Sequence, residues 1–264
     1  MEGILEKCEM REGVTFENGG EKIFGVLHRP IDNVLAPVVL IFHGFASSKL
    51  GSNRCYVTLA EAFAKEGIAS LRIDFRGSGD SEGSLAELSF EDLVSDATAS
   101  VSFLENLEGI DTSRLGIFGA SLGGTLAILS QKKSLSAKAL ALWAPVASGE
   151  LWLRDFLQQH PEAASGNPHE ALSSYQGIPL HPEFRNQFGQ MRAYEALARM
   201  PHLPFLHMHG AKDPVITLTH QGAFHAACPH GEFKTYPEAE HSLGFAEVFP
   251  DVIRQTIDWF QEHL

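Results

Sequence analysis

Short apolar runs alternate along this chain with longer segments of helical periodicity, and this alternation constrains the fold more than any other feature. The runs predicted to be strands are residues 37–42, 69–75, 115–118, 137–146, 205–209 and 232–236. The segments predicted to be helices are residues 54–66, 89–107, 122–132, 194–199, a stretch from about 218, and a last one from about 244 to 263. Such alternation is typical of a parallel sheet with helices on both faces. An Asn-Gly-Gly turn within residues 15–30 predicts a hairpin in addition. We therefore expect an α/β fold with a mostly parallel sheet of about eight strands.

The regular alternation breaks between about residues 147 and 190. An amphipathic stretch at 151–157 is followed there by residues rich in Pro, Gly, His and Ser. A length of 264 residues suits one large α/β domain or two small ones. We expect a single domain, residues 1–264, with a small cap insertion at about 147–190. Four aromatic residues of the insertion either line a substrate pocket or pack the cap onto the core: Trp152, Phe156, Tyr175 and Phe184.

The charge balance is strongly acidic, with 33 Asp and Glu against 20 Lys and Arg and a net charge of −13. Nucleic acids and anionic membranes bind positive surfaces, so the charge argues against partners of both kinds. Three scattered cysteines form a poor disulfide framework and indicate a reducing compartment. No stretch approaches the roughly 18 apolar residues of a membrane span. We expect a cytoplasmic protein without signal peptide or membrane span, and the sequence leaves its oligomeric state open, a homodimer included.

The strongest local signal for chemistry is Gly119-Ala-Ser121-Leu-Gly123, a G-x-S-x-G pattern between a predicted strand and a predicted helix. A serine hydroxyl is a weak nucleophile that needs exposure, a base, and hydrogen-bond donors for the oxyanion it creates. A tight strand-to-helix turn supplies the exposure, and glycines on both sides of the serine permit the turn. The alternative is a turn with a merely capping serine. The strand before the motif and the glycines opening the helix after it favour Ser121 as a nucleophile.

Two backbone N–H groups are candidates for an oxyanion hole. Leu122 opens the predicted helix, where the first amides have no partner within the helix. His43-Gly44-Phe45 follows the early strand at 37–42, and the loop at this place supplies the second N–H in folds with a nucleophile elbow. We predict that this second donor is the N–H of Phe45. His43 itself is open to a simpler role, as a partner of loop carbonyls.

An acid and a base follow the serine in chain order. Asp213 stands just after the strand at 205–209, at the edge where open α/β sheets build their sites. His241 lies after one more strand, and the order Ser, Asp, His is that of the nucleophile-elbow hydrolases. Asp213 precedes a proline and is also suited to a simple Asx turn. Glu238 and Glu240 are alternative acids, although they stand very close to His241 in sequence.

Two further patterns have readings that we weigh against the hydrolase. His207 and His209 alternate on a strand like a pair of metal ligands, but no third ligand has a suitable context, and we expect no metal. The loop at 77–83 resembles a phosphate-binding loop. It lacks the Lys-Ser/Thr of such loops, so we expect a structural loop in which Asp80 and Ser81 make turn hydrogen bonds.

With these residues in view, the chain resembles the serine aminopeptidase-like and monoglyceride-lipase-like branch of the α/β-hydrolases, and bacterial cinnamoyl (feruloyl) esterases in particular. The matching stretches are residues 39–45, the Asp-Phe-Arg-Gly-Ser-Gly-Asp-Ser loop within 72–83, residues 119–124, residues 209–215 and residues 240–241. The resemblance implies an α/β-hydrolase fold, hydrolysis of carboxylic esters without a cofactor, and substrate choice by a small cap.

The sequence thus predicts a serine esterase acting on small-molecule esters through Ser121, His241 and Asp213, with an acyl-enzyme intermediate. Aryl or short-chain acyl esters, cinnamoyl esters among them, are the substrates we expect. A peptidase or amidase, and an acyl-thioesterase or acyltransferase, would use the same three residues. A ligand-binding protein that keeps this fold without catalysis is a further alternative.

Overall fold

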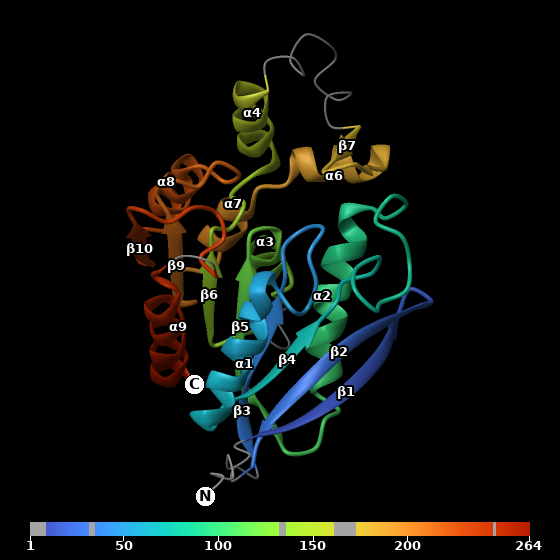
Figure 1. Ribbon diagram of the computed structural model, residues 1–264, viewed down its shortest axis with the longest axis vertical. Coiled ribbons are helices and arrows are strands. Elements are labelled where there is room, and N and C mark those ends of the chain that lie inside the picture. Colours follow the sequence, from blue (N-terminus) through green and yellow to red (C-terminus); the bar gives the residue numbers. More distant parts are fainter. Residues whose placement is uncertain (1–8, 32–34, 132–135, 161–172, 245–246) are drawn as a thin grey trace, which may run out of the picture.

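A computed structural model describes residues 9–31, 35–131, 136–160, 173–244 and 247–264 (Figure 1). The strands are β1 (Glu9–Asn18), β2 (Glu21–Pro30), β3 (Ala36–Phe42), β4 (Ala69–Ile73), β5 (Ile110–Ala120), β6 (Ala139–Trp143), β7 (Ser174–Tyr175), β8 (Ile178–Pro179), β9 (Phe205–Gly210) and β10 (Glu232–Tyr236). The helices are η1 (Ser52–Arg54), α1 (Cys55–Lys65), α2 (Phe90–Leu104), α3 (Leu122–Leu129), α4 (Gly149–Gln159), α6 (Pro182–Gln190), α7 (Ala193–Ala198), α8 (Leu218–Ala227) and α9 (Phe249–His263).

Eight of these strands form one sheet in the order β1-β2-β4-β3-β5-β6-β9-β10. The pairs β1–β2 and β2–β4 are antiparallel, and the other pairs of the sheet are parallel. The expected α/β fold with a mostly parallel sheet of eight strands is therefore confirmed. Strands β1 and β10 are the two edges of the sheet, and β3 and β5 lie at its centre.

The N-terminal hairpin turns through Gly19 and Gly20, as its sequence predicts. Both glycines have positive φ, and Asn18 pairs with Glu21 across the turn. The first strand begins at Glu9, six residues earlier than the apolar pattern indicates. Most of β1 is exposed, so backbone pairing and not an apolar alternation extends this edge strand.

Two apolar cores lie on opposite faces of the sheet. One face packs against α1 and α9, with Phe63 of α1 in edge contact with Phe260 of α9. The other face packs against α2, α3, α7 and α8, and extends to α4 and α6. Because the strands alternate their side chains between these cores, the apolar runs of the sequence are apolar at nearly every position.

Strand and helix bounds also differ from the sequence pattern at β5, β6 and α9, and β6 (Ala139–Trp143) is shorter than the predicted strand at 137–146. Strand β5 begins at Ile110, where Ile110 and Asp111 pair with the start of β3 before the register shifts. Helix α9 begins at Phe249 and not near residue 244. None of these changes moves the strand end that carries the G-x-S-x-G pattern.

Residues 147–190 contain α4, the two-stranded hairpin β7–β8, and α6. Figure 1 shows these elements beyond one end of the sheet, the end to which β5 and β9 point. Helix α6 contacts α2 and α4, and α4 also contacts α8. Residues 161–172 lie outside the described residues. The segment that the sequence marks as an insertion thus stands over the strand ends that precede Ser121 and Asp213.

Two remaining features concern the cysteines and the membrane. Cys55 and Cys228 are buried free thiols, and Cys8 lies outside the described residues. No helix in the described ranges is both long and apolar enough to cross a membrane.

Candidate active site

Ser121 occupies a tight turn between β5, which ends at Ala120, and α3, which begins at Leu122. Its backbone has φ 54° and ψ −124°, a strained conformation for a residue with a side chain. The turn can be this sharp because residue 119 is a glycine. A Cβ at this position would lie 2.3 Å from the carbonyl oxygen of Gly123. The Ser121 N–H donates to the carbonyl of Trp143 at 2.8 Å, which ties the turn to β6. The surrounding structure therefore holds a strained serine with its side chain at the surface of a pocket.

Asp213 lies in the loop after β9, and its side chain is fully buried. Its Oδ1 accepts hydrogen bonds from the N–H groups of Val215 and Ile216, both at 2.8 Å. Its Oδ2 accepts from His241 Nδ1 at 2.7 Å. Since a carboxylate oxygen accepts, the proton of the neutral His241 ring is assigned to Nδ1, and Nε2 carries a free lone pair.

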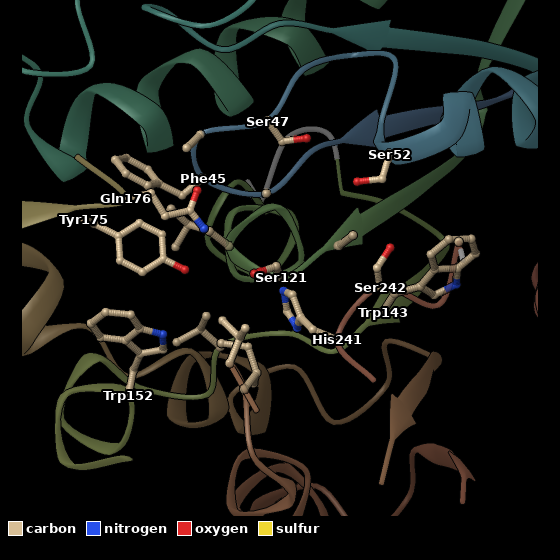
Figure 2. Close-up of a pocket in the computed structure, with 18 of the residues that line it drawn as sticks. Phe45, Ser47, Ser52, Ser121, Trp143, Trp152, Tyr175, Gln176, His241 and Ser242 are labelled. Atoms are coloured by element: carbon tan, nitrogen blue, oxygen red, sulfur yellow. The ribbon is translucent and has the colours of Figure 1, made fainter. Parts of the chain in front are cut away.

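His241 follows β10, on the loop that leads toward α9, and its side chain is 26% exposed. His241 and Ser121 line the same pocket, which has a volume of about 300 Å³. Figure 2 shows the imidazole of His241 directed toward the Ser121 side chain. The structure thus brings together the three residues that the sequence selects as nucleophile, base and acid, although they stand 92 and 28 positions apart along the chain.

The two backbone groups expected at an oxyanion hole also belong to this pocket. Phe45 and Leu122 both line it. The loop that carries Phe45 lies tightly against the nucleophile turn, since a Cβ at position 44 would be 3.1 Å from Cβ of Ser121. Leu122 is the first residue of α3, so its N–H has no carbonyl one turn earlier within the helix.

One side of the pocket is rich in aromatic residues from α4, the β7–β8 hairpin and α6, and Gln176 and Arg185 also belong to the lining. We call this side the aromatic arm, and it is lined by Trp152, Tyr175, Leu180, Phe184 and Phe188. The rings contact one another, with Trp152 in edge contact with Tyr175 and Phe188. Burial raises the pKa of the Tyr175 phenol, so this hydroxyl stays protonated at neutral pH and is available as a donor.

Three of the four aromatic residues named from the sequence line this arm, and Phe156 does not. Phe156 stands one turn after Trp152 on α4 and stacks on its ring, with the centroids 5.2 Å apart. Phe156 therefore packs against Trp152 without lining the pocket itself. Phe188, which the sequence analysis missed, takes a place in the lining. Its position one turn after Phe184 on α6 was the available signal.

The other side of the pocket carries hydroxyl and thiol groups, and we call it the polar arm. It is lined by Ser52, Cys55, Tyr56, Trp143 and Ser242. Figure 2 shows Ser52 and Ser242 across His241 from Trp152 and Tyr175. The sequence analysis named none of these residues, although Ser242 directly follows the predicted base.

Cys55 is a thiol in the pocket lining and hence a further potential nucleophile. It is 4% exposed, and burial raises the pKa of its thiol to about 11. The thiol is therefore protonated near neutral pH, and a protonated thiol is a poor nucleophile. Ser121, which lines the same pocket as His241, is the better candidate.

Of the alternative acids, Glu238 has another partner, and so do both members of the histidine pair. Glu238 pairs with Lys212 at an exposed position. His207 Nε2 lies 3.1 Å from His209 Nδ1, and His209 Nε2 lies 2.7 Å from the carbonyl oxygen of Ile216. Among the described residues no group of three or more His, Cys, Asp or Glu is arranged to hold a metal.

The loop after β4 is held by hydrogen bonds of its own. Ser81 Oγ donates to the carbonyl of Asp74 at 2.7 Å, and the Asp80 N–H donates to the Asp74 carboxylate at 2.9 Å. The side chain of Asp80 pairs with Lys49. Asp80 and Ser81 therefore make the turn hydrogen bonds that the sequence predicts for a structural loop.

Comparison with known proteins identifies the family. The model of the serine aminopeptidase S33 family matches residues 35–176, more than half of the chain. The chain therefore belongs to this family of α/β-hydrolases, and the resemblance indicated by its motifs is confirmed.

Curated relatives match over shorter stretches. The quorum-quenching protein AidA of Acinetobacter baumannii is 34% identical over 42% of this chain and 36% of its own length. The esterase FrsA of an Enterobacter species is 33% identical over 53% of this chain and 32% of its own length. The chain spans 32–46% of the length of the first curated relatives it matches.

Among solved structures, the fold is similar to that of Est1E from Butyrivibrio proteoclasticus with bound ferulic acid. The TM-score is 0.78 at 20% sequence identity, and the match covers 95% of this chain and 98% of Est1E. At this identity the comparison shows a similarity of fold alone.

Proposed function

We propose that this protein is a carboxylic ester hydrolase in which Ser121 is the nucleophile, His241 the general base and Asp213 the acid that orients it. The observation that carries the proposal is the hydrogen bond from His241 to the buried Asp213, on a histidine that shares a pocket with the strained Ser121. The family assignment and the esterases among the matched proteins support the same reaction. No cofactor takes part in the mechanism.

The reaction proceeds in two halves through an acyl-enzyme. Ser121 Oγ attacks the ester carbonyl while His241 Nε2 takes its proton, and Asp213 stabilises the resulting imidazolium through Nδ1–H. The N–H groups of Phe45 and Leu122 bind the oxyanion. His241 then gives the proton to the departing alcohol. A water molecule repeats the sequence and releases the acid.

The two arms of the pocket suit the two parts of an ester. The leaving oxygen must lie within reach of His241, and Ser242 of the polar arm directly follows that residue. We therefore place the alcohol in the polar arm and the acyl group in the aromatic arm, with residues 147–190 acting as a cap on a single domain. An aryl acyl group, such as a cinnamoyl group, fits an arm walled by Trp152, Tyr175 and Phe184.

Hydrolysis of p-nitrophenyl esters from acetate to long acyl chains, together with methyl ferulate and methyl esters of aliphatic acids, tests this proposal. Ser121→Ala should lower kcat by about a millionfold, because serine and histidine act as one unit. Ser102→Ala, at a serine on α2 outside the pocket, is the matched control and should retain full activity. Methyl ferulate should be preferred to aliphatic methyl esters, and Phe184→Ala should reduce this preference.

The outcomes separate the proposal from its rivals. A folded protein that turns over no ester, and that a fluorophosphonate does not label, is not a serine hydrolase. Labelling at Ser121 without ester turnover would point to amides or thioesters. A thiohydrolase of Aspergillus aculeatus, 34% identical over 41% of this chain, makes thioesters the first alternative to assay.

A further inference from the structure

The peptide that joins Gly44 to Phe45 is held by a buried histidine. His43 is 2% exposed, and its Nδ1 lies 2.7 Å from the carbonyl oxygen of Gly44. Its Nε2 accepts a hydrogen bond from the N–H of Phe75 at 3.1 Å. Because a backbone N–H can only donate, Nε2 must be the acceptor, and the proton of the neutral ring lies on Nδ1. The ring therefore donates to the Gly44 carbonyl.

This hydrogen bond also fixes the direction of an N–H group. The Gly44 carbonyl and the Phe45 N–H belong to one peptide unit, which is planar and trans, so the two groups point in opposite directions. A carbonyl turned toward His43 in the core sends the N–H to the other side of the peptide. Gly44 and Phe45 line the pocket there, with Ser121. No other hydrogen bond of this peptide is found among the described residues.

The far end of the same loop is fixed to the end of β4. The Lys49 N–H donates to Asp74 Oδ1 at 2.6 Å, and Arg72 donates to the Lys49 carbonyl at 2.6 Å. Asp74 and Arg72 are both buried. Residues at and just after the end of β4 thus hold the loop at His43 and at Lys49. Among the described residues, His43 is the side chain that hydrogen-bonds to the Gly44–Phe45 peptide.

We propose that His43 is a positioning residue of the oxyanion hole, which holds the Gly44–Phe45 peptide so that the Phe45 N–H faces the substrate oxygen. This inference rests on the proposed ester hydrolysis. His43 acts through the backbone and touches neither the substrate nor the reacting atoms. A misdirected N–H would weaken binding of the transition state more than binding of the ester, because the full negative charge on oxygen develops only during the reaction.

Two substitutions separate the two hydrogen bonds of the ring. His43→Asn keeps a donor near the position of Nδ1 and loses the acceptor for Phe75. His43→Gln keeps an acceptor near the position of Nε2 and loses the donor to Gly44. We expect His43→Gln to lower kcat on the order of 100-fold with KM within about twofold. His43→Asn should retain most of the wild-type kcat. Phe260→Leu, in the apolar core between α1 and α9 and outside the pocket lining, is the control for a loss of stability alone.

The affinity of a trifluoromethyl ketone matched to the substrate and the rate of Ser121 labelling by a fluorophosphonate are the second readouts. Both should fall in His43→Gln by about the same factor as kcat and recover in His43→Asn, while the urea midpoint is measured for each variant. Equal losses in the two variants, or an effect that appears in KM and the urea midpoint only, would overturn the role of His43. Wild-type protein without ester turnover would count against the proposed function, and the labelling rates would still decide the inference.

Discussion

The two oxygens of the Asp213 carboxylate have different partners, and the difference makes this residue sensitive to the smallest substitution. Oδ1 accepts from two backbone N–H groups, so only an oxygen fits there. Oδ2 accepts from His241 Nδ1. An asparagine would keep its oxygen at the first place and turn its NH₂ toward the histidine.

Asp213→Asn should therefore lower kcat on the order of 10⁴-fold while the protein stays folded. An NH₂ group facing Nδ1 makes that atom an acceptor, so the ring proton moves to Nε2. A protonated Nε2 cannot accept the proton of Ser121. Steady-state kinetics with the preferred ester, beside a urea unfolding curve, measure both parts. A variant within tenfold of wild-type kcat would exclude Asp213 as the orienting acid. Glu240→Gln is the control at the alternative acid and should retain activity.

Helix α4 carries Trp152 into the pocket, and the buried Asp155 on the same helix fastens it to α8. The carboxylate of Asp155 accepts hydrogen bonds from the hydroxyls of Thr217 and Thr219 at the start of α8. His220 Nε2 lies 3.8 Å from the same carboxylate. This buried polar contact thus joins α4, which carries Trp152, to α8.

Asp155→Ala should lower the free energy of unfolding by about 2–3 kcal/mol, since it removes charged hydrogen bonds at a buried site. Amide hydrogen exchange in α4 should accelerate while β5 and β6 keep their protection, and KM for aryl esters should rise. Glu150→Ala is the matched control on the same helix. Glu150 is exposed and pairs with Arg192, so its loss should change stability by less than about 1 kcal/mol. Equal exchange in both variants would show that Asp155 does not fasten the helix.

At the scale of the whole molecule, several histidines are buried in the neutral form. Burial lowers the pKa of His28, His43, His207 and His209, and it lowers the pKa of His220 to about 4. Asp155 opposes the shift at His220, but burial outweighs it. Between pH 6.5 and 4 the unfolded chain therefore binds protons that the folded protein does not.

Stability should accordingly be full above about pH 6.5 and fall as the pH drops toward 4, by roughly 3 kcal/mol for His220 alone. Urea unfolding at pH 8, 7, 6 and 5 measures the slope. His220→Asn, which keeps an acceptor for the Ala147 N–H, should make the slope less steep, and His202→Asn at an exposed position should not. An unchanged slope in His220→Asn would show that this histidine is protonated in the folded state.

Much of the architecture and the chemistry follows from the sequence by itself. Apolar runs and helical periodicity determined the sheet and the order of its elements, because both patterns depend on local repeat and burial. The glycines around Ser121 determined the turn, since no side chain fits beside it. Chain order then singled out Asp213 and His241 from the other acids and histidines.

Only the tertiary structure decided which side chains share the pocket. Phe156 and Phe188 have the same chemistry and similar helical contexts, yet one supports Trp152 and the other lines the arm, because the packing of α4 and α6 sets which face of each helix turns inward. The place of Ser52 in the polar arm was likewise decided by packing. The role of His43 also depends on the folded chain, because its ring joins Gly44 to Phe75, which stands 32 residues after His43. Local sequence specifies an element and its apolar face, whereas contacts between distant elements arise only when the chain has packed.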